Sequence, residues 1–219
     1  MDEIVIRLAR CLASFERLRI LSRLAAAGET APTRLGRELH MPANSLSAHL
    51  AKLAAVGLVK RRRSGRWSYC IAASPYGPST LSGMTLAWLR TVLPKPKAAL
   101  DGCKPEEARR LSAEEAQCRL HELIFDAATA FTDLRRLQIL RHLFAAGEAT
   151  AEALCKELSM SGWAVRRHTD KLLRRGYLST RSAGRLPFYR LAAKFKTPIH
   201  SRLFEIIRGT WAKRSLHTS

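Results

Sequence analysis

The sequence predicts a mainly α-helical protein with two small β-hairpins, built from two copies of one domain. Residues 17–29 read RLRILSRLAAAGE, and residues 136–148 read RLQILRHLFAAGE. This offset of 119 residues continues without a gap to Arg66 and Arg185, with 20 identities over 50 aligned positions. Because the period is long and the copies are only two, the repeat indicates two domains and not a solenoid.

The first element of each copy is a predicted helix. In residues 17–27, Leu18, Leu21 and Leu24 recur at the spacing of one helix face. Gly28 follows directly, and glycine ends helices because it adopts positive φ without steric cost. The second copy repeats the pattern over residues 137–146.

Two further helices and a tight turn follow. Thr30 is expected to cap a short helix that has Pro32 in its first turn and ends at Leu39. A turn at residues 41–43 leads to a helix over residues 44–55. Its inward residues are expected to be Leu46, Leu50 and Leu53. In the second copy the corresponding helices cover residues 151–158 and 163–175.

Each copy then ends in a predicted hairpin. Residues 58–62 and 67–71 suit two strands, and Ser64-Gly65 suits the turn between them. We expect the second copy to gain one residue here, so that Tyr69 matches Tyr189. Two helices, a turn, a third helix and a hairpin form the order of a winged helix-turn-helix domain. The predicted fold class is therefore mainly α with small β wings, in two tandem winged helix-turn-helix domains.

The charge distribution predicts a polyanionic partner. The 219 residues contain 38 Lys and Arg against 18 Asp and Glu, a net charge of +20. The net charge is +8 over residues 1–73, 0 over 74–129, +7 over 130–193 and +5 over 194–219. The excess lies in the repeats and the C-terminal tail, which is typical of two modules that face DNA.

The third helix and the hairpin of each copy supply the candidate DNA-binding residues. Arg reads guanine and Asn reads adenine in the major groove, small residues permit close approach, and cations beside the hairpin turn neutralise phosphates. Any single Arg could equally be a solvated surface charge, and the two His could be hydrogen-bonded to the neighbouring turn. The candidates are Asn44, Ser45, Ser47, Ala48, His49, Lys52, Arg62, Arg63 and Arg66, and then Trp163, Ala164, Arg166, Arg167, His168, Lys171 and Arg185.

These segments resemble the ArsR family of bacterial repressors. The family's characteristic run appears here as residues 12–17, Gly28-Glu29, the SAHLAKL of residues 47–53, and Gly57-Leu58-Val59. The second copy is more divergent, and together the copies cover most of the chain. The resemblance implies a winged helix-turn-helix regulator that binds double-stranded DNA, with repression as the expected effect.

Family members are typically homodimers paired through helices outside the helix-turn-helix. The resemblance therefore implies an internal pseudo-dimer, with a first domain at 1–93, a linker at 94–110 and a second domain at 111–219. A further homodimer of whole chains is the competing arrangement. The candidate pairing helices are Asp2–Ala13, Leu81–Val92, Ser112–Phe131 and Pro198–Lys213.

The metal-sensing motifs of the family are missing. Leu35-Gly36-Arg37 stands where such members carry Cys-x-Cys, and the second copy has only Cys155 there. His200 and Glu205 do not form the family's pattern on the last helix. Because Zn²⁺ needs three or four suitable ligands, we expect no metal and no cofactor. A thiol redox switch stays open beside the interpretation of the five Cys as small buried residues.

The predicted function is sequence-specific transcriptional regulation without enzymatic activity, because the sequence contains none of the P-loop, GxSxG or HExxH motifs. A tandem winged-helix protein of replication or chromosome organisation and a basic RNA-binding factor are the alternatives. No segment reaches the roughly 20 apolar residues of a membrane span. The acidic N-terminal start does not suit a signal peptide. An odd number of Cys without CxxC spacing favours a reduced, cytoplasmic protein.

Overall fold

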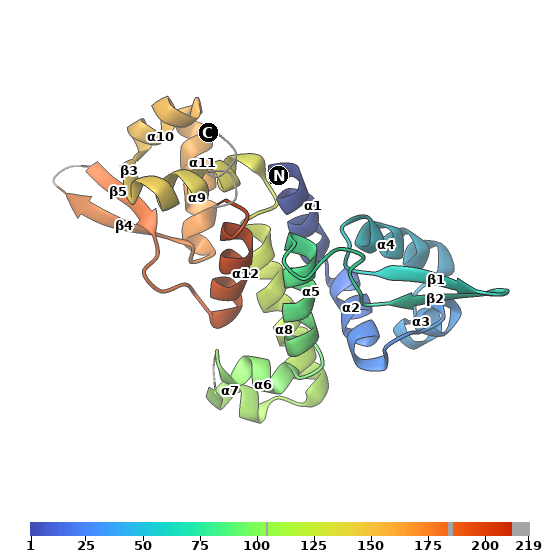
Figure 1. The fold of residues 1–219 in the computed structure, drawn as a ribbon. Helices are drawn as coiled ribbons and strands as arrows, with labels where there is room; N and C mark the ends of the chain where they lie inside the picture. Colours follow the sequence, from blue (N-terminus) through green and yellow to red (C-terminus); the bar gives the residue numbers. More distant parts are fainter. Residues whose placement is uncertain (104, 184–185, 212–219) are drawn as a thin grey trace. The chain divides into compact units, whose positions relative to one another are not determined.

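The computed structural model describes residues 1–103, 105–183 and 186–211. The chain divides into two compact units (Figure 1). The first unit comprises Arg10–Phe125, and the second comprises Met1–Ala9 together with Asp126–Ser219. Two helices, α1 (Asp2–Leu12) and α8 (Ala113–Thr129), each contribute residues to both units. The first unit therefore contains the first repeat and most of α8, the helix that precedes the second repeat. The second unit contains the second repeat and most of α1, the helix that precedes the first repeat.

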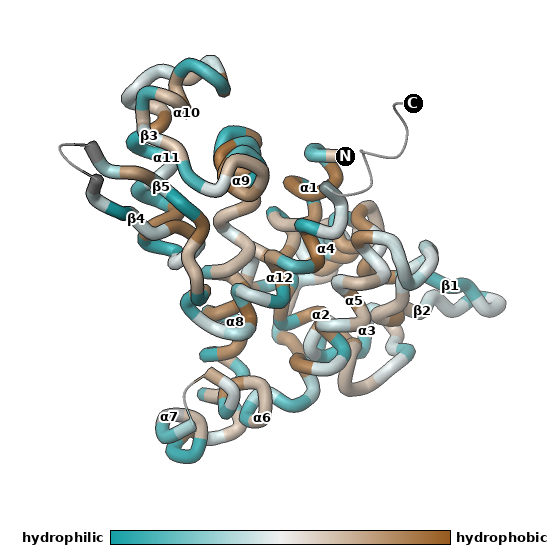
Figure 2. Tube along the Cα trace, turned by 60° about the vertical axis from the view of Figure 1, so that its left-hand side comes forward, coloured by the Kyte–Doolittle hydropathy of each residue, from teal (hydrophilic) through white to brown (hydrophobic). Residues whose placement is uncertain are grey.

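The first unit is mostly helical and contains one two-stranded antiparallel sheet. Its elements follow the predicted order of two helices, a turn, a third helix and a hairpin. Figure 2 shows the hairpin as largely hydrophilic. After the residues of α1 the elements are α2 (Phe15–Ala27), α3 (Pro32–Leu39), α4 (Ala43–Ala55), β1 (Lys60–Ser64), β2 (Trp67–Ile71), α5 (Leu81–Val92), α6 (Pro96–Asp101), α7 (Pro105–Arg110) and then α8.

The second unit repeats this order and contains a three-stranded antiparallel sheet in the order β3-β5-β4. The short strand β3, which precedes the second helix of the repeat, was not predicted. Its counterpart in the first unit is a single bridge between Thr30 and Cys70. The elements are α9 (Leu134–Ala146), β3 (Glu148–Thr150), α10 (Ala151–Leu158), α11 (Gly162–Arg174), β4 (Leu178–Ala183), β5 (Leu186–Leu191) and α12 (Pro198–Arg208).

The strand register shows that the repeat continues without a gap to the end of the hairpin. Arg62 pairs with Tyr69 in the first unit, and Arg181 pairs with Phe188 in the second. Arg181 therefore lies 119 positions after Arg62, and Phe188 lies 119 positions after Tyr69. The predicted extra residue, which would match Tyr69 to Tyr189, is wrong. The sequence misled because both residues are Tyr, whereas the strand pairing matches Ser64 with Trp67 in the first unit and Ala183 with Leu186 in the second, again 119 positions apart.

Thr30 does not cap α3. The N-cap of this helix is Ala31, without a side-chain hydrogen bond. Thr30 is instead held in the bridge to β2, because its backbone N–H donates to the Cys70 carbonyl at 2.9 Å and its carbonyl accepts from Cys70 at 2.9 Å. In the second copy the residue equivalent to Ala31 is Thr150, and its hydroxyl accepts from the Ala153 N–H.

The residues expected to form a linker contain the two short helices α6 and α7. The helices expected to mediate pairing are present as α1, α5, α8 and α12. The last one was predicted to reach Lys213 but ends at Arg208, and residues beyond Trp211 lie outside the described part of the chain. Among the described residues, no helix is long and apolar enough to cross a membrane.

Each unit has its own core. In the first unit the helical-spacing residues Leu18, Leu21 and Leu24 are buried, as predicted. In the second unit Tyr177 is fully buried, and its hydroxyl donates to the carbonyl of Ala127 at 3.2 Å. Burial raises the pKa of this phenol well above its usual value, so that the hydroxyl stays a donor.

One arginine clamp occurs in both copies. Arg17 donates to the carbonyls of Cys11 and Arg10 at 2.9 and 2.6 Å. Arg136, its equivalent, donates to Ala130 and Thr129 at 3.0 Å each. Both guanidinium groups satisfy carbonyls at the end of the preceding helix, where the helix dipole also favours a cation. Each clamp therefore fixes the start of the repeat to the helix before it.

Substitution of Arg136 by Met should lower the free energy of unfolding by about 3 kcal/mol, because charge-assisted hydrogen bonds to buried carbonyls are lost. Arg136 is buried and also donates to the Thr132 hydroxyl, whereas Arg17 is half-buried. The matched change Arg17→Met should therefore cost less. Urea unfolding followed by circular dichroism measures both, and a larger loss for Arg17→Met would contradict the assignment.

Candidate nucleic-acid interface

The helix-turn-helix of the first unit is formed by α3, a tight turn and α4. His40 ends α3 in the left-handed conformation, with φ of 51°. The Met41 N–H then donates to the Gly36 carbonyl at 2.9 Å. The second copy has the same turn, with Ser159 at φ of 49° and Met160 donating to Cys155 at 3.0 Å. The shared backbone geometry sets the angle at which the third helix leaves the turn.

The inward side of α4 packs through Leu46, Leu50 and Leu53, as predicted. This orientation leaves a stripe of small and polar residues exposed to solvent, recurring at intervals of three and four residues. The stripe contains one cation and no acidic group, so that another surface could approach the helix closely. Its residues are Asn44, Ser47, Ala48, Ala51 and Lys52.

The wing of the first unit, formed by β1 and β2, carries the cations that α4 lacks. Because successive strand residues point to opposite faces, Arg61 and Arg63 share one face and Arg62 lies on the other. Arg61 donates to the Ser47 carbonyl at 3.2 Å, so its face of the wing is turned toward α4. Arg63 and Arg66 make no side-chain hydrogen bond or ion pair within the described residues.

Arg62 is held by a carboxylate that is distant in the sequence. Its guanidinium donates to both oxygens of Glu29, at 2.8 and 3.0 Å, and lies 5.7 Å from the Tyr69 ring centroid. The hydrogen bonds from Arg62 lower the pKa of the Glu29 carboxyl below its usual value. The predicted phosphate contact at Arg62 is therefore already engaged within the protein, whereas Arg63 is available.

In the second unit the cations lie on the helix itself. The exposed side of α11 forms a shallow groove of about 400 Å³. Trp163, 70% exposed, begins this side, and the Arg167 guanidinium lies 5.2 Å from its ring centroid. The residues that line the groove are Trp163, Arg166, Arg167, Asp170 and Arg174.

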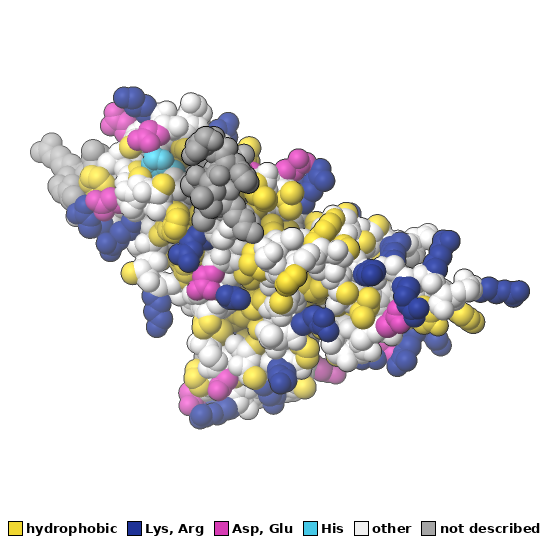
Figure 3. Space-filling model, viewed as in Figure 1, with side chains coloured by type: hydrophobic (Ala, Val, Ile, Leu, Met, Phe, Trp, Pro, Cys, Tyr) yellow, Lys and Arg dark blue, Asp and Glu magenta, His cyan; other side chains and the backbone are white. Residues whose placement is uncertain are grey.

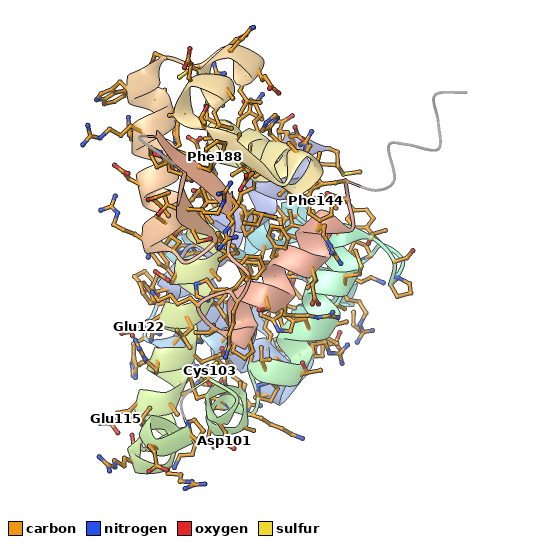
Figure 4. All side chains as sticks on the ribbon, turned by 90° about the vertical axis from the view of Figure 1, so that its left-hand side faces the viewer. Asp101, Cys103, Glu115, Glu122, Phe144 and Phe188 are labelled. Carbon is orange, nitrogen blue, oxygen red and sulfur yellow. The ribbon has the colours of Figure 1, made fainter. Side chains whose placement is uncertain are left out.

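The wing of the second unit is much less basic. Thr180 and Ser182 occupy the positions of Arg61 and Arg63. Arg181, the equivalent of Arg62, donates to both Glu148 oxygens at 3.1 and 2.5 Å and lies 5.2 Å from the centroid of Phe188, labelled on β5 in Figure 4. The predicted contact at Arg185 lies outside the described residues.

The side chains of both candidate histidines are partly buried against their own unit and do not belong to the exposed surfaces of α4 and α11. His49 is half-buried, and desolvation by burial lowers its pKa. Burial also lowers the pKa of His168, whose Nδ1 lies 3.7 Å from an Asp133 oxygen at the start of α9. Lys171 is likewise half-buried. Burial is the main reason that its pKa is lowered, and the positive charge of Arg136 is the next largest cause. These positions suit support of the helix rather than contact with a partner.

The predicted DNA-binding residues differ in how exposed they are in the structure. The exposed ones are Asn44, Ser47, Ala48, Lys52, Arg62, Arg63, Arg66, Trp163, Arg166 and Arg167, and the half-buried ones are Ser45, His49, Ala164, His168 and Lys171. Sequence reasoning missed Ala51, Trp67, Asp170 and Arg174, although helical spacing from Ser47 and Arg166 could have indicated three of them.

All charged Lys, Arg, Asp and Glu residues of the candidate interface in the first unit are cationic. Residues 41–73 contain six Lys and Arg and no Asp or Glu. The cations gather around the β1–β2 hairpin (Figure 3). Trp67, beside the turn, is 67% exposed. A cationic hairpin next to a neutral helix is suited to an anionic partner that extends beyond the helix.

Comparisons with known proteins found a domain family and similar solved structures. Residues 12–62 match a helix-turn-helix domain family. A solved structure of an ArsR family transcriptional regulator is 21% identical, with 43% of this chain and 88% of that chain covered and a TM-score of 0.32. No curated protein matches the chain. The family match places a helix-turn-helix domain in the first repeat.

The described residues contain no group of three or more His, Cys, Asp or Glu side chains arranged to hold a metal ion. None of the five cysteines, all of which lie in the described part of the chain, forms a disulfide bond. Cys11 and Cys70 are buried, and burial raises the pKa of both thiols. A raised pKa disfavours the reactive thiolate, so these two positions suit packing.

Proposed function

We propose that this protein is a transcriptional regulator that binds duplex DNA through both units. The observation that supports this most directly is the acid-free surface formed by the exposed stripe of α4 and the cationic wing beside it. An α-helix fits the major groove, and a β-hairpin reaches the adjacent backbone or minor groove. Repression is the proposed effect, since a protein that occupies a promoter need not contact the polymerase.

The two units would recognise DNA in different ways. In the first unit, α4 offers Asn44 for adenine and Ala48 for a thymine methyl, while Arg63 and Arg66 neutralise phosphates. In the second unit, Arg166 and Arg167 combine base reading with charge. One unit is therefore positioned mainly by its wing and the other mainly by its helix.

We further propose that the two units act as an internal pseudo-dimer. The neutral charge of residues 74–129, which include α5 and the whole of α8, suits close pairing. We propose a binding role for the protein rather than an enzymatic one.

Binding to duplex DNA should depend strongly on salt. With about five phosphate contacts, doubling the salt concentration should weaken binding by tenfold or more, because condensed counterions are released. Fluorescence anisotropy with a duplex DNA and a duplex RNA of the same sequence measures this. Equal or stronger binding to the RNA, or a salt-independent affinity, would contradict the proposal and favour an RNA-binding factor.

The wing and the helix should respond differently to substitution. Arg63→Ala with Arg66→Ala should weaken binding to specific and random duplexes alike and reduce the salt slope by about two. Arg166→Ala or Arg167→Ala should cost about 1–3 kcal/mol and relax the preference at particular base pairs. Arg62→Ala is the matched control for the wing. Because Arg62 is paired with Glu29, its loss should matter less than that of Arg63.

One chain should cover two unequal half-sites. Recognition helices of a dimer meet successive major grooves about 34 Å apart, and here the two helices differ in sequence. Operators selected from genomic DNA should therefore be asymmetric, and native mass spectrometry should find one chain on each. Two chains on a palindrome would instead show a homodimer of chains.

A further inference from the structure

A groove in the first unit lies between the helix-turn-helix and the wing. Its volume of about 860 Å³ is in the range of small-molecule sites. The floor is apolar, formed by Leu46 and Leu50, which are 2% and 1% exposed. Pro32 and Met41 form part of the walls. At Gly36 a Cβ would lie 3.2 Å from the Met41 carbonyl oxygen, so a larger residue would crowd this end of the groove.

The edge of the groove is cationic. Arg37 from α3 and Arg61 from β1 line it together with His40 of the turn, and none of the described lining residues is a carboxylate. Arg37 is exposed and makes no side-chain hydrogen bond or ion pair within the described residues. Arg61 donates from one nitrogen to Ser47. A planar guanidinium can bind both oxygens of a carboxylate, so this edge is suited to an organic anion.

The start of α4 adds to this preference. Pro42 is the N-cap and provides no side-chain hydrogen bond, and both Pro42 and Ala43 line the groove. The first N–H groups of a helix need acceptors, and the helix dipole favours an anion there. In the second unit the equivalent cap is Ser161, whose hydroxyl accepts from the Ala164 N–H.

The features of the groove are specific to the first copy. Cys155 replaces Gly36, Lys156 replaces Arg37, and Thr180 replaces Arg61. If the groove served only as a path for the DNA backbone, both DNA-binding units would be expected to retain it. The combination of an apolar floor, two arginines and an uncapped helix instead suits a ligand with a charged head and an apolar body.

We propose that this groove binds a small organic carboxylate with an aromatic or branched aliphatic body, and that binding opposes DNA binding. The second part rests on the proposed function. The carboxylate would pair with Arg37 and Arg61, while the body contacts Leu46 and Leu50. Because Ser47 belongs both to the groove and to the exposed stripe of α4, the ligand would occupy and neutralise the surface that faces DNA.

The test is a titration of the full chain at constant ionic strength with four probes: benzoate, benzyl alcohol, acetate and inorganic phosphate. Isothermal titration calorimetry should show saturable binding of benzoate, at least about tenfold tighter than of the other three, because only benzoate combines charge and body. Arg37→Ala should weaken benzoate binding by about tenfold, as expected for one charge-assisted pair. Lys156→Ala, at the equivalent position of the second unit, is the matched control and should leave it unchanged.

A second measurement separates the site from the function. Benzoate should weaken duplex binding by the unsubstituted chain, and Arg37→Ala should reduce that sensitivity. No saturable benzoate binding, equal binding of phosphate, or an equal loss in Lys156→Ala would overturn the ligand site. If benzoate binds as expected but the chain binds no duplex DNA, the proposed function fails while the ligand site stands.

Discussion

The inward packing of Leu46, Leu50 and Leu53 is the constraint on which the first unit depends. Burial of these three side chains fixes the rotation of α4 about its own axis, because one helix face must leave water. The rotation in turn determines which residues are exposed on the other side. In the second unit the same positions hold Val165, Thr169 and Leu172. The buried Thr169 remains compatible with the core because its hydroxyl donates to the Val165 carbonyl at 2.9 Å.

From this shared framework the two copies have distributed their charge differently. In the first unit the cations lie on β1 and the helix stripe is almost neutral, whereas in the second unit α11 carries them and β4 carries mainly Ser and Thr. The Glu29–Arg62 and Glu148–Arg181 pairs are common to both. Exposed pairs of this kind contribute little to stability, so their effect is to hold one wing arginine away from other partners.

The almost neutral stripe of α4 and the groove beside it share Ser47, and both depend on residues that the second copy replaces. Gly36 places no side chain at one end of the groove, and Pro42 leaves the start of α4 without a side-chain cap. The second copy has a larger residue at the first position and a capping Ser at the second. The two units thus share the backbone geometry of the turn, including its left-handed residue, while the surfaces around it differ.

The sequence by itself determined the repeat, the order of helices and hairpins, and the inward residues of the first and third helices, because apolar periodicity is a local property of the chain. Only the tertiary structure decided which cations are available. The partner of Arg62 is Glu29, 33 positions earlier, and no local pattern indicates that pair. The same holds for Thr30, which pairs with Cys70 instead of capping a helix. It holds as well for the assignment of Met1–Ala9 to the unit of the second repeat. Such contacts join residues far apart in the chain, so their geometry exists only once the elements have packed.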